Sequence, residues 1–324
     1  WWEIEKIWYP KHLSLEQCSS EITARYKARL LQGDSLTDLT GGFGIDCSFL
    51  ATGFKSATYV ERQEELCEIA AHNFPVLNLN HINIKNEDGV TYLQVMSPVD
   101  CLFLDPARRN EHGGKTVAIS DCEPNVAELE ELLLQKANRV MIKLSPMLDL
   151  SLALKELKQT QEVHILSVNN ECKELLLVLE RGKEQHFVFT REQEQCSECT
   201  YTDSLETYLY EPNASLLKAG AFRSIAAAYP VRKLHPNSHL YTSDTFIENF
   251  PGRIFRIVNQ CSFNKKEVKE NLADLKKANV TVRNFPATVA ELRKRIHLAE
   301  GGDTYLFAST LNNGQKVLIR CEKV

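Results

Sequence analysis

No apolar run in this 324-residue sequence approaches the roughly 18 residues that a transmembrane helix needs. The start of the chain also lacks the positively charged segment followed by an apolar one that marks a secretion signal. We therefore expect no membrane partner. The sequence begins with Trp1 and Trp2 rather than Met, so we expect a fragment whose true N-terminus is missing.

Metal-ligand patterns are scarce as well. The ten cysteines are scattered, and several lie inside apolar segments, as Cys101 does, which is typical of reduced cysteines in the cytoplasm. Cys196 and Cys199 have the spacing of half a zinc site, but no second pair or matching histidines lie near them in the sequence. The sequence thus predicts a cytoplasmic protein without a metal.

The net charge of -5 conceals an uneven distribution. Residues 251–324 hold 14 Lys plus Arg and 7 Asp plus Glu, whereas residues 1–250 hold 24 and 36. A basic segment on an acidic body indicates a polyanionic partner, although an uneven but merely solvated surface is the alternative.

Short β-rich segments alternate with helical patterns over the first half of the chain. The expected strands are 35–40, 56–61, 82–86, 100–105, 139–144 and 163–168, and the expected helices between them include 62–73, 125–137 and 150–158. This alternation of helices with nearly continuous apolar strands predicts an α/β fold with a mostly parallel sheet covered on both faces. Residues 174–180 and 186–190 have only a short turn between them, so we expect them to form an antiparallel hairpin at the sheet's edge.

The two ends of the chain have other patterns. A weak capping box at Ser14 and Gln17 begins a helix expected over 14–31, and a helix is expected at 215–229. After residue 251, alternating strands and helices predict a small α+β unit of ferredoxin-like type. The expected organisation is a helical segment at 1–34, an α/β domain at 35–200 and an α+β region at 205–324, divided into a connecting subdomain (205–250) and a basic domain (251–324).

The stretch DLTGGFGID, residues 38–46, joins an expected strand to an expected helix through three glycines. This geometry presents bare backbone amides to a nucleotide. Gly41, Gly42 and Gly44 do not complete the G-x-G-x-x-G pattern of dinucleotide sites, because the third glycine of that pattern is missing. Asp38 would also repel a pyrophosphate, whereas it suits a ligand that carries an ammonium group.

Two more acids follow later strands. Glu61 ends the second expected strand, where a carboxylate can accept hydrogen bonds from both ribose hydroxyls. Asp88, after the third, could accept a hydrogen bond from an adenine amino group. An amine, a ribose and an adenine without a pyrophosphate describe S-adenosylmethionine. The predicted cofactor-binding residues are Asp38, Thr40, Gly41, Gly42, Gly44, Glu61 and Asp88.

The motifs DLTGGFG, YVE, NEDGVTYL and LDPARR occur in the order and spacing of class I S-adenosylmethionine-dependent methyltransferases, which this sequence resembles from roughly Ser35 to Thr190. The resemblance implies a Rossmann-like sheet. The segments EQCSSE and KLSPMLD and the basic C-terminal part look like a bacterial group of methyltransferases with a C-terminal THUMP-like domain. Because THUMP domains are RNA-binding modules of RNA-modifying enzymes, the resemblance implies an RNA partner. The candidate RNA contacts are Arg253, Arg256, Lys265, Lys266, Arg283, Arg293, Lys294 and Arg295.

The resemblance places the Asp-Pro pair after the fourth strand beside the transferred methyl group. An attacking exocyclic amine becomes cationic as its bond to carbon forms, and a carboxylate that accepts its N–H stabilises that charge. Asp105 could do this, and the Pro106 carbonyl could accept a second N–H. Arg108 could stack on a base or bind a phosphate, and Arg109 adds a second cation.

Residues at the end of the fifth expected strand could also face the substrate. Lys143 and Ser145 lie there, where ligands bind in such sheets, although a capping role is equally open. Ser19, Ser20 and Glu21 could cover the cofactor, with a helix cap as the alternative.

The motif D-P-A-R limits the chemistry. Adenine amino-methyltransferases usually carry an aromatic residue where this chain has Arg108. The uridine C5-methyltransferases, with D-P-P-R, need a nucleophilic cysteine in a following segment, where this chain has Ser145. An amino or hydroxyl acceptor is therefore favoured, and the 38–46 loop resembles that of an rRNA guanine-N2 methyltransferase. The alternatives are a methyltransferase for a small molecule or protein, with the C-terminal domain serving assembly, and a non-catalytic nucleotide-binding protein.

Overall fold

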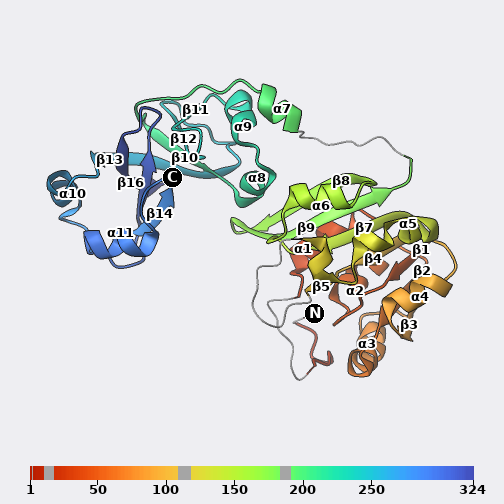
Figure 1. Ribbon diagram of the computed structural model, residues 1–324. Helices are drawn as coiled ribbons and strands as arrows, with labels where there is room; N and C mark the ends of the chain where they lie inside the picture. Colours follow the sequence, from red (N-terminus) through yellow and green to blue (C-terminus); the bar gives the residue numbers. More distant parts are fainter. Residues whose placement is uncertain (2, 11–17, 109–117, 183–190) are drawn as a thin grey trace. The chain divides into compact units, whose positions relative to one another are not determined.

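The computed structural model describes residues 1, 3–10, 18–108, 118–182 and 191–324 (Figure 1). The chain forms two compact units. Unit 1 comprises Trp1–Leu166 and Lys173–Phe187, and unit 2 comprises Ser167–Cys172 and Val188–Val324.

Unit 1 contains a seven-stranded sheet with the strand order β3-β2-β1-β4-β7-β9-β8. Its strands are β1 (Ser35–Asp38), β2 (Ser56–Glu61), β3 (Ile82–Asn86), β4 (Val99–Leu104), β7 (Ala137–Leu144), β8 (Thr160–Val168) and β9 (Glu171–Glu180). The first five strands of this order pair in parallel. Their carboxyl ends therefore meet at one edge of the sheet, where ligands bind in open α/β folds. The expected α/β fold class is confirmed.

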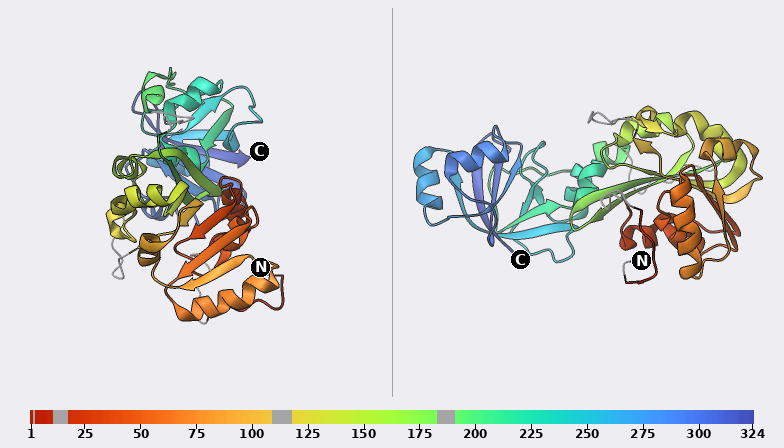
Figure 2. Two further views of the ribbon diagram at one scale, coloured as in Figure 1. Left: turned by 90° about the vertical axis from the view of Figure 1, so that its right-hand side faces the viewer. Right: turned by 90° about the horizontal axis from the view of Figure 1, so that it is seen from below.

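Helices connect these strands. They are α1 (Glu21–Ala28), α2 (Ile45–Ala51), α3 (Glu64–Val76), α4 (Gly89–Val95), α5 (Val126–Lys136) and α6 (Leu150–Glu156), with a 3₁₀ turn, η2 (Ile119–Asp121). In both views of Figure 2 the orange helix α3 lies along the β3 edge of the sheet, where the two elements contact each other. Helix α1 is shorter than predicted and begins after Ser20, whose hydroxyl accepts the Thr23 N–H. The proposed cap, Ser14, lies outside the described residues.

The antiparallel strand of this sheet is not the one expected. Asn169 and Asn170, at φ 52° and 63°, form a two-residue turn between β8 and β9. Strand β9 then runs antiparallel to β7 and separates it from β8. The predicted antiparallel hairpin at the sheet's edge is therefore present, but β8 and β9 form it, whereas the sequence analysis paired 174–180 with 186–190. Residues 186–190 themselves lie outside the described part of the chain.

Apolar side chains from neighbouring strands form the core beneath the site. Cys101, Phe103, Met141 and Val178 belong to one cluster and are at most 1% exposed. Cys101 is thus packed as a small hydrophobic side chain, as the sequence predicts.

Unit 2 contains a second seven-stranded sheet, ordered β11-β12-β10-β13-β16-β15-β14. Its strands are β10 (Tyr208–Pro212), β11 (Arg232–Lys233), β12 (Tyr241–Ser243), β13 (Gly252–Ser262), β14 (Asn279–Arg283), β15 (Thr304–Thr310) and β16 (Lys316–Lys323). Its helices are α7 (Arg191–Cys196), α8 (Ala214–Ala219), α9 (Phe222–Ala228), α10 (Lys265–Leu272) and α11 (Val289–Ile296).

Strands β5 (Ala107–Arg108) and β6 (Cys122–Glu123) form a separate small sheet in unit 1.

Three features of unit 2 bear on the sequence analysis. The helix expected at 215–229 is two helices, because Gly220 adopts a left-handed conformation at φ 78° and ends α8. Helix α7 lies within the stretch before residue 200 and belongs to unit 2, so the structure divides the chain earlier than expected. Finally, β10 pairs with β13, so the regions 205–250 and 251–324 share one sheet.

Candidate functional site

The glycine loop after β1 is shaped by the residues around it. A Cβ on Gly41 would lie 2.2 Å from the Tyr59 ring, so only glycine fits there. Gly42 and Gly44 have φ values of 53° and 87°, which favour glycine. The Tyr59 hydroxyl donates a hydrogen bond to the Gly42 carbonyl and fixes the loop from beneath.

Thr40 connects this loop to the end of β4. Its N–H donates to Asp38 Oδ1 over 3.0 Å, and its Oγ1 accepts the Asp105 N–H over 2.6 Å. The glycine loop and the Asp-Pro motif are therefore adjacent, because the parallel strands β1 and β4 are neighbours in the sheet.

Glu61 is buried at the end of β2, and its carboxylate is oriented by the backbone. Oε2 accepts the Gly42 N–H over 2.8 Å, and Oε1 accepts the Gln63 N–H over 2.9 Å. Because each carboxylate oxygen can accept more than one hydrogen bond, Glu61 retains capacity for ligand hydroxyls.

Asp38 is a buried carboxyl without an ion-pair partner among the described residues; it is 1% exposed. Burial raises its pKa to about 8, and the charges of Asp46 and Asp105 act in the same direction. The Thr40 N–H and Lys143 only partly offset these effects. This position is therefore suited to a cationic ligand group, which would supply the missing counter-charge.

Asp88 precedes α4 and is exposed. Its Oδ1 accepts the Val90 and Thr91 N–H groups over 3.1 and 2.9 Å, so the residue caps the helix. In the described residues its hydrogen bonds all go to Oδ1, which leaves Oδ2 for the predicted contact with an amino group.

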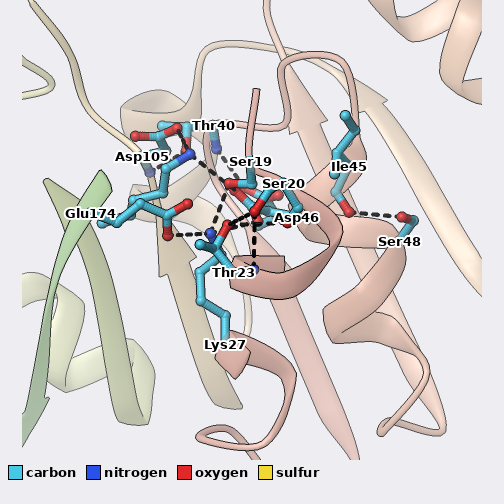
Figure 3. Close-up of polar contacts among 12 residues, drawn as sticks. Ser19, Ser20, Thr23, Lys27, Thr40, Ile45, Asp46, Ser48, Asp105 and Glu174 are labelled. Carbon is cyan, nitrogen blue, oxygen red and sulfur yellow. Dashed lines mark hydrogen bonds and ion pairs between the residues drawn. The ribbon is translucent and has the colours of Figure 1, made fainter. Parts of the chain in front are cut away.

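A chain of buried ion pairs extends from Asp105 into the protein. Lys143 Nζ lies 2.6 Å from Asp105 Oδ2 and 3.1 Å from Asp46 Oδ2. Lys27 Nζ lies 2.9 Å from Asp46 Oδ1 and 2.5 Å from Glu174 Oε2. Figure 3 shows Lys27 reaching from α1 to Asp46 at the start of α2 and to Glu174 on β9.

Ser19 lies at the centre of this chain (Figure 3). Its hydroxyl accepts a hydrogen bond from Lys27 over 2.7 Å and donates one to Asp46 over 2.8 Å. Its neighbour Ser20 caps α1, which is the alternative weighed for this segment.

The charges in this chain determine which groups are ionised. Burial raises the pKa of Asp105, and Lys143 opposes that effect. Burial also disfavours ionised Asp46, but Lys143 and Lys27 hold the pKa of Asp46 at about 2. Although burial lowers the pKa of Lys143, Asp105 and Asp46 raise it above its ordinary value. Both Lys143 and Asp46 are therefore charged at neutral pH.

The remaining predicted residues are placed as follows. Pro106 is buried directly after Asp105, and Arg108 pairs with Cys122 through its backbone in the small β5–β6 sheet. The Arg108 side chain and the whole of Arg109 lie outside the described structure. The Ser145 hydroxyl accepts the Met147 N–H over 3.3 Å, which is a turn-forming contact.

Sequence reasoning missed Lys27, Asp46 and Glu174. Asp46 is the final acid of DLTGGFGID, so that motif contained a signal for it. Lys27 and Glu174 are 147 positions apart, and nothing in either local sequence indicates that they meet.

A metal centre and a membrane segment find no support in the described ranges. They contain no group of three or more His, Cys, Asp or Glu side chains placed to hold a metal ion. Over the same ranges, every helix is too short or too polar to cross a bilayer. Cys196 and Cys199 are free thiols.

Comparisons with known proteins cover both units. A ferredoxin-like domain family matches residues 208–251, and a THUMP domain-like family matches residues 252–323. The crystal structure of a candidate methyltransferase from Porphyromonas gingivalis W83 is 36% identical in sequence, covers 98% of this chain and 84% of its own, and superimposes with a TM-score of 0.89. An uncharacterised S-adenosylmethionine-dependent methyltransferase from Mycobacterium tuberculosis is 21% identical over 305 residues, which are 88% of this chain and 80% of the relative.

The cofactor of this group is S-adenosylmethionine, and the site fits it. Asp38 lacks a counter-charge that the cofactor's ammonium group would supply, and the Glu61 carboxylate is held by two backbone N–H groups and keeps capacity to accept further hydrogen bonds. A side chain at Gly41 would collide with Tyr59, so the loop keeps bare backbone beside these two acids. With the sequence and structural match to the Porphyromonas protein, these features establish that the chain belongs to the S-adenosylmethionine-dependent methyltransferases with a C-terminal THUMP-like domain.

Proposed function

We propose that this enzyme transfers a methyl group to an exocyclic amino group, or else a hydroxyl group, of a nucleotide in RNA. The observation that carries the choice of acceptor is the Asp105–Lys143 pair at 2.6 Å, located where β4 meets the glycine loop. Among the carboxylates at this edge of the sheet, Asp105 directly follows β4. Its N–H donates to Thr40, which lies at the start of the glycine loop.

The chemistry needs little from the protein beyond position and charge. S-adenosylmethionine supplies the methyl group, and its sulfur keeps the electron pair of the broken C–S bond. Asp105 accepts an N–H of the attacking amine, and its negative charge stabilises the ammonium that develops as the N–C bond forms. The ammonium then loses a proton to Asp105, which passes it to water. The Pro106 carbonyl is the proposed second acceptor, and Arg108 and Arg109 are proposed to bind the nucleotide.

Lys143 makes this role possible at neutral pH. Burial favours the neutral form of Asp105, which would be unable to stabilise a cation, and the Lys143 ammonium counteracts that tendency. We therefore assign Lys143 to the acceptor side of the site, and Ser145 to the turn that follows β7.

Ring-carbon methylation is disfavoured by the state of the nearby thiol. Cys18 lies close enough to Asp105 and Lys143 for their charges to affect it. Burial raises its pKa, with Asp46 and Asp105 adding to the effect and Lys143 opposing it. A neutral thiol is a poor nucleophile, so the raised pKa of this cysteine argues against the covalent catalysis that uridine C5 chemistry needs.

We assign RNA binding to the THUMP-like domain. Fewer basic residues are proposed to contact RNA than the sequence analysis named as candidates. Arg253 and Arg283 both bind the buried Glu211, and Arg256 pairs with Glu322. The guanidinium of Arg295 lies 4.2 Å from the centre of the Phe263 ring. These arginines already have partners within the fold.

The lysines of α10 and α11 are better placed. The two helices contact each other, and their lysine side chains are exposed without an ion-pair partner in the described residues. The proposed RNA contacts are Lys265, Lys266, Lys269 and Lys294.

The test compares the salt dependence of RNA binding in variants of the full chain. Replacing these four lysines by alanine should lower the slope of log affinity against log salt by up to about 3, since each phosphate contact contributes roughly 0.7 to 0.9. Arg256→Ala, which removes a paired cation from the same domain, is the matched control and should change the slope little. Salt-independent binding, or equal slopes in all proteins, would instead favour a small-molecule or protein substrate.

A further inference from the structure

Lys143 carries one positive charge and forms ion pairs with two carboxylates. Its ammonium lies 2.6 Å from Asp105 and 3.1 Å from Asp46, so it is shared unequally in favour of Asp105. The Lys143 and Asp46 side chains are each 11% exposed, whereas the Asp105 side chain is 38% exposed and forms the solvent-accessible end of the chain. In such surroundings an anion without its own cation is costly, so Asp46 would compete with Asp105 for Lys143.

Lys27 relieves this competition. It is 0% exposed, and its ammonium lies 2.9 Å from Asp46 Oδ1, whereas Lys143 approaches Oδ2. The Ser19 hydroxyl bridges the same two residues. With Lys27 as its second cation, Asp46 is neutralised without drawing Lys143 away from Asp105.

We propose that Lys27 is a positioning residue for methyl transfer: acting through Asp46, it keeps Lys143 against Asp105 and thereby fixes the carboxylate that faces the methyl acceptor. The inference rests on the proposed function of Asp105. Under this proposal, helix α1, which precedes the Rossmann-like sheet in the chain, contributes a functional residue to the active site.

Asp38 and Cys18 lie within the electrostatic range of this chain of ion pairs, and Glu174 on β9 is the second anion of Lys27. Among the described residues, the buried Cys47 thiol also lies near this chain, and burial with the charges of Asp38 and Asp46 raises its pKa. Removing Lys27 alone leaves Glu174 as a buried anion, which could unfold the protein. The double substitution Lys27→Met with Glu174→Gln removes one positive and one negative charge and avoids this problem.

The matched control is Arg25→Met. Arg25 is a basic residue on the same helix, but its ion pair with Glu21 is exposed, with side chains 61% and 59% accessible. Loss of this pair should have little effect on stability or on the site. Ser19→Ala is a milder second variant, because it removes the hydroxyl that bridges Lys27 and Asp46 and leaves their direct ion pair and every charge in place.

The first measurement is an NMR titration of the aspartate carboxyl carbons in the intact protein, with Asp105→Asn used to assign the Asp105 signal. In the double variant, Asp46 draws Lys143 away, and the Asp105 midpoint should shift to higher pH. Loss of the Lys27 charge acts on Asp105 in the same direction, so Ser19→Ala, which keeps that charge, isolates the positional effect. Ser19→Ala should shift it in the same direction by less, and Arg25→Met should leave it unchanged. An unaltered Asp105 midpoint in both the double variant and Ser19→Ala would overturn the proposal.

The second measurement is the single-turnover rate of methyl transfer to RNA across pH, together with calorimetric affinity for S-adenosylhomocysteine. The double variant should transfer methyl about 10-fold or more slowly at neutral pH, because a misplaced catalytic group is costly, with its acid limb moved to higher pH and the cofactor affinity retained. An unchanged rate and profile would contradict a positioning role. Full activity in Asp105→Ala would instead refute the proposed function, while the titration would still report whether Lys27 controls Asp105.

Discussion

Asp38→Asn should make the enzyme more stable and less able to bind its cofactor. Asn has nearly the same shape as Asp, and its side-chain oxygen can still accept the Thr40 N–H that Asp38 accepts over 3.0 Å. The substitution removes only the ionisable charge. In the free protein this charge is buried and lacks a cationic partner in the described part of the chain, so its removal should stabilise the fold.

The size and pH dependence of the effect follow from the pKa. Burial, with the nearby acids Asp46 and Asp105, raises the folded-state pKa of Asp38 from 3.8 to about 8. Because Asp38 binds a proton more tightly in the folded protein, protonation of Asp38 stabilises the fold. This stabilisation is fully present below the pKa that Asp38 has in the unfolded chain, and it is lost as the pH rises through the folded-state pKa. At about 1.4 kcal/mol per pKa unit, the full loss is on the order of 6 kcal/mol, and local relaxation should reduce it to about 2–4 kcal/mol.

Urea unfolding at pH 5 and at pH 8 measures this difference. The variant should gain about 2–4 kcal/mol over the natural protein at pH 8 and clearly less at pH 5. Calorimetry should show S-adenosylmethionine binding weakened by roughly 10- to 100-fold, as expected for the loss of a charged hydrogen-bond partner worth about 1.5–3 kcal/mol. A variant that is less stable at pH 8, or one with unchanged cofactor affinity, would refute this reading of Asp38.

Three further substitutions test other parts of the site. Glu61→Ala should weaken S-adenosylhomocysteine binding by about 1–3 kcal/mol in calorimetry, because ribose hydroxyls lose a charged acceptor; unchanged affinity would remove Glu61 from the site. Gly41→Ala should destabilise the protein by about 1–3 kcal/mol in urea, since its Cβ would lie 2.2 Å from the Tyr59 ring, and equal stability would contradict that packing. Lys143→Met should raise the pKa of Asp105 further, so the acid limb of methyl transfer should move to higher pH; a profile identical to that of the natural enzyme would separate Lys143 from catalysis.

The sequence was a good guide to the parallel sheet because its strands are short apolar runs separated by helical patterns. The glycine loop, Glu61 and Asp105 could be placed near one another because the carboxyl ends of parallel strands share an edge. The antiparallel partner was wrongly predicted, since the position of β9 depends on a turn at Asn169 and Asn170 and on pairing with β7.

The ion-pair chain was beyond sequence reasoning for a different reason. Lys27 meets Asp46 and Glu174 only after α1, α2 and β9 have packed together, and a lone lysine on a short helix resembles an ordinary surface residue. For the RNA contacts, the sequence analysis named residues that the fold already pairs with acids. Arg253 and Arg283 contribute to the basic count of the C-terminal region, yet both are paired with Glu211 in the fold.

The most direct test of the proposed function is mass spectrometry of nucleosides from RNA treated with the enzyme and isotopically labelled S-adenosylmethionine. The natural enzyme should place the label on an exocyclic amine, or on a hydroxyl, of one nucleoside. Asp105→Ala should retain affinity for S-adenosylhomocysteine while transferring label on the order of 100-fold more slowly or worse. Label found only in protein or small molecules, on a base carbon, or at an equal rate in Asp105→Ala would contradict the account.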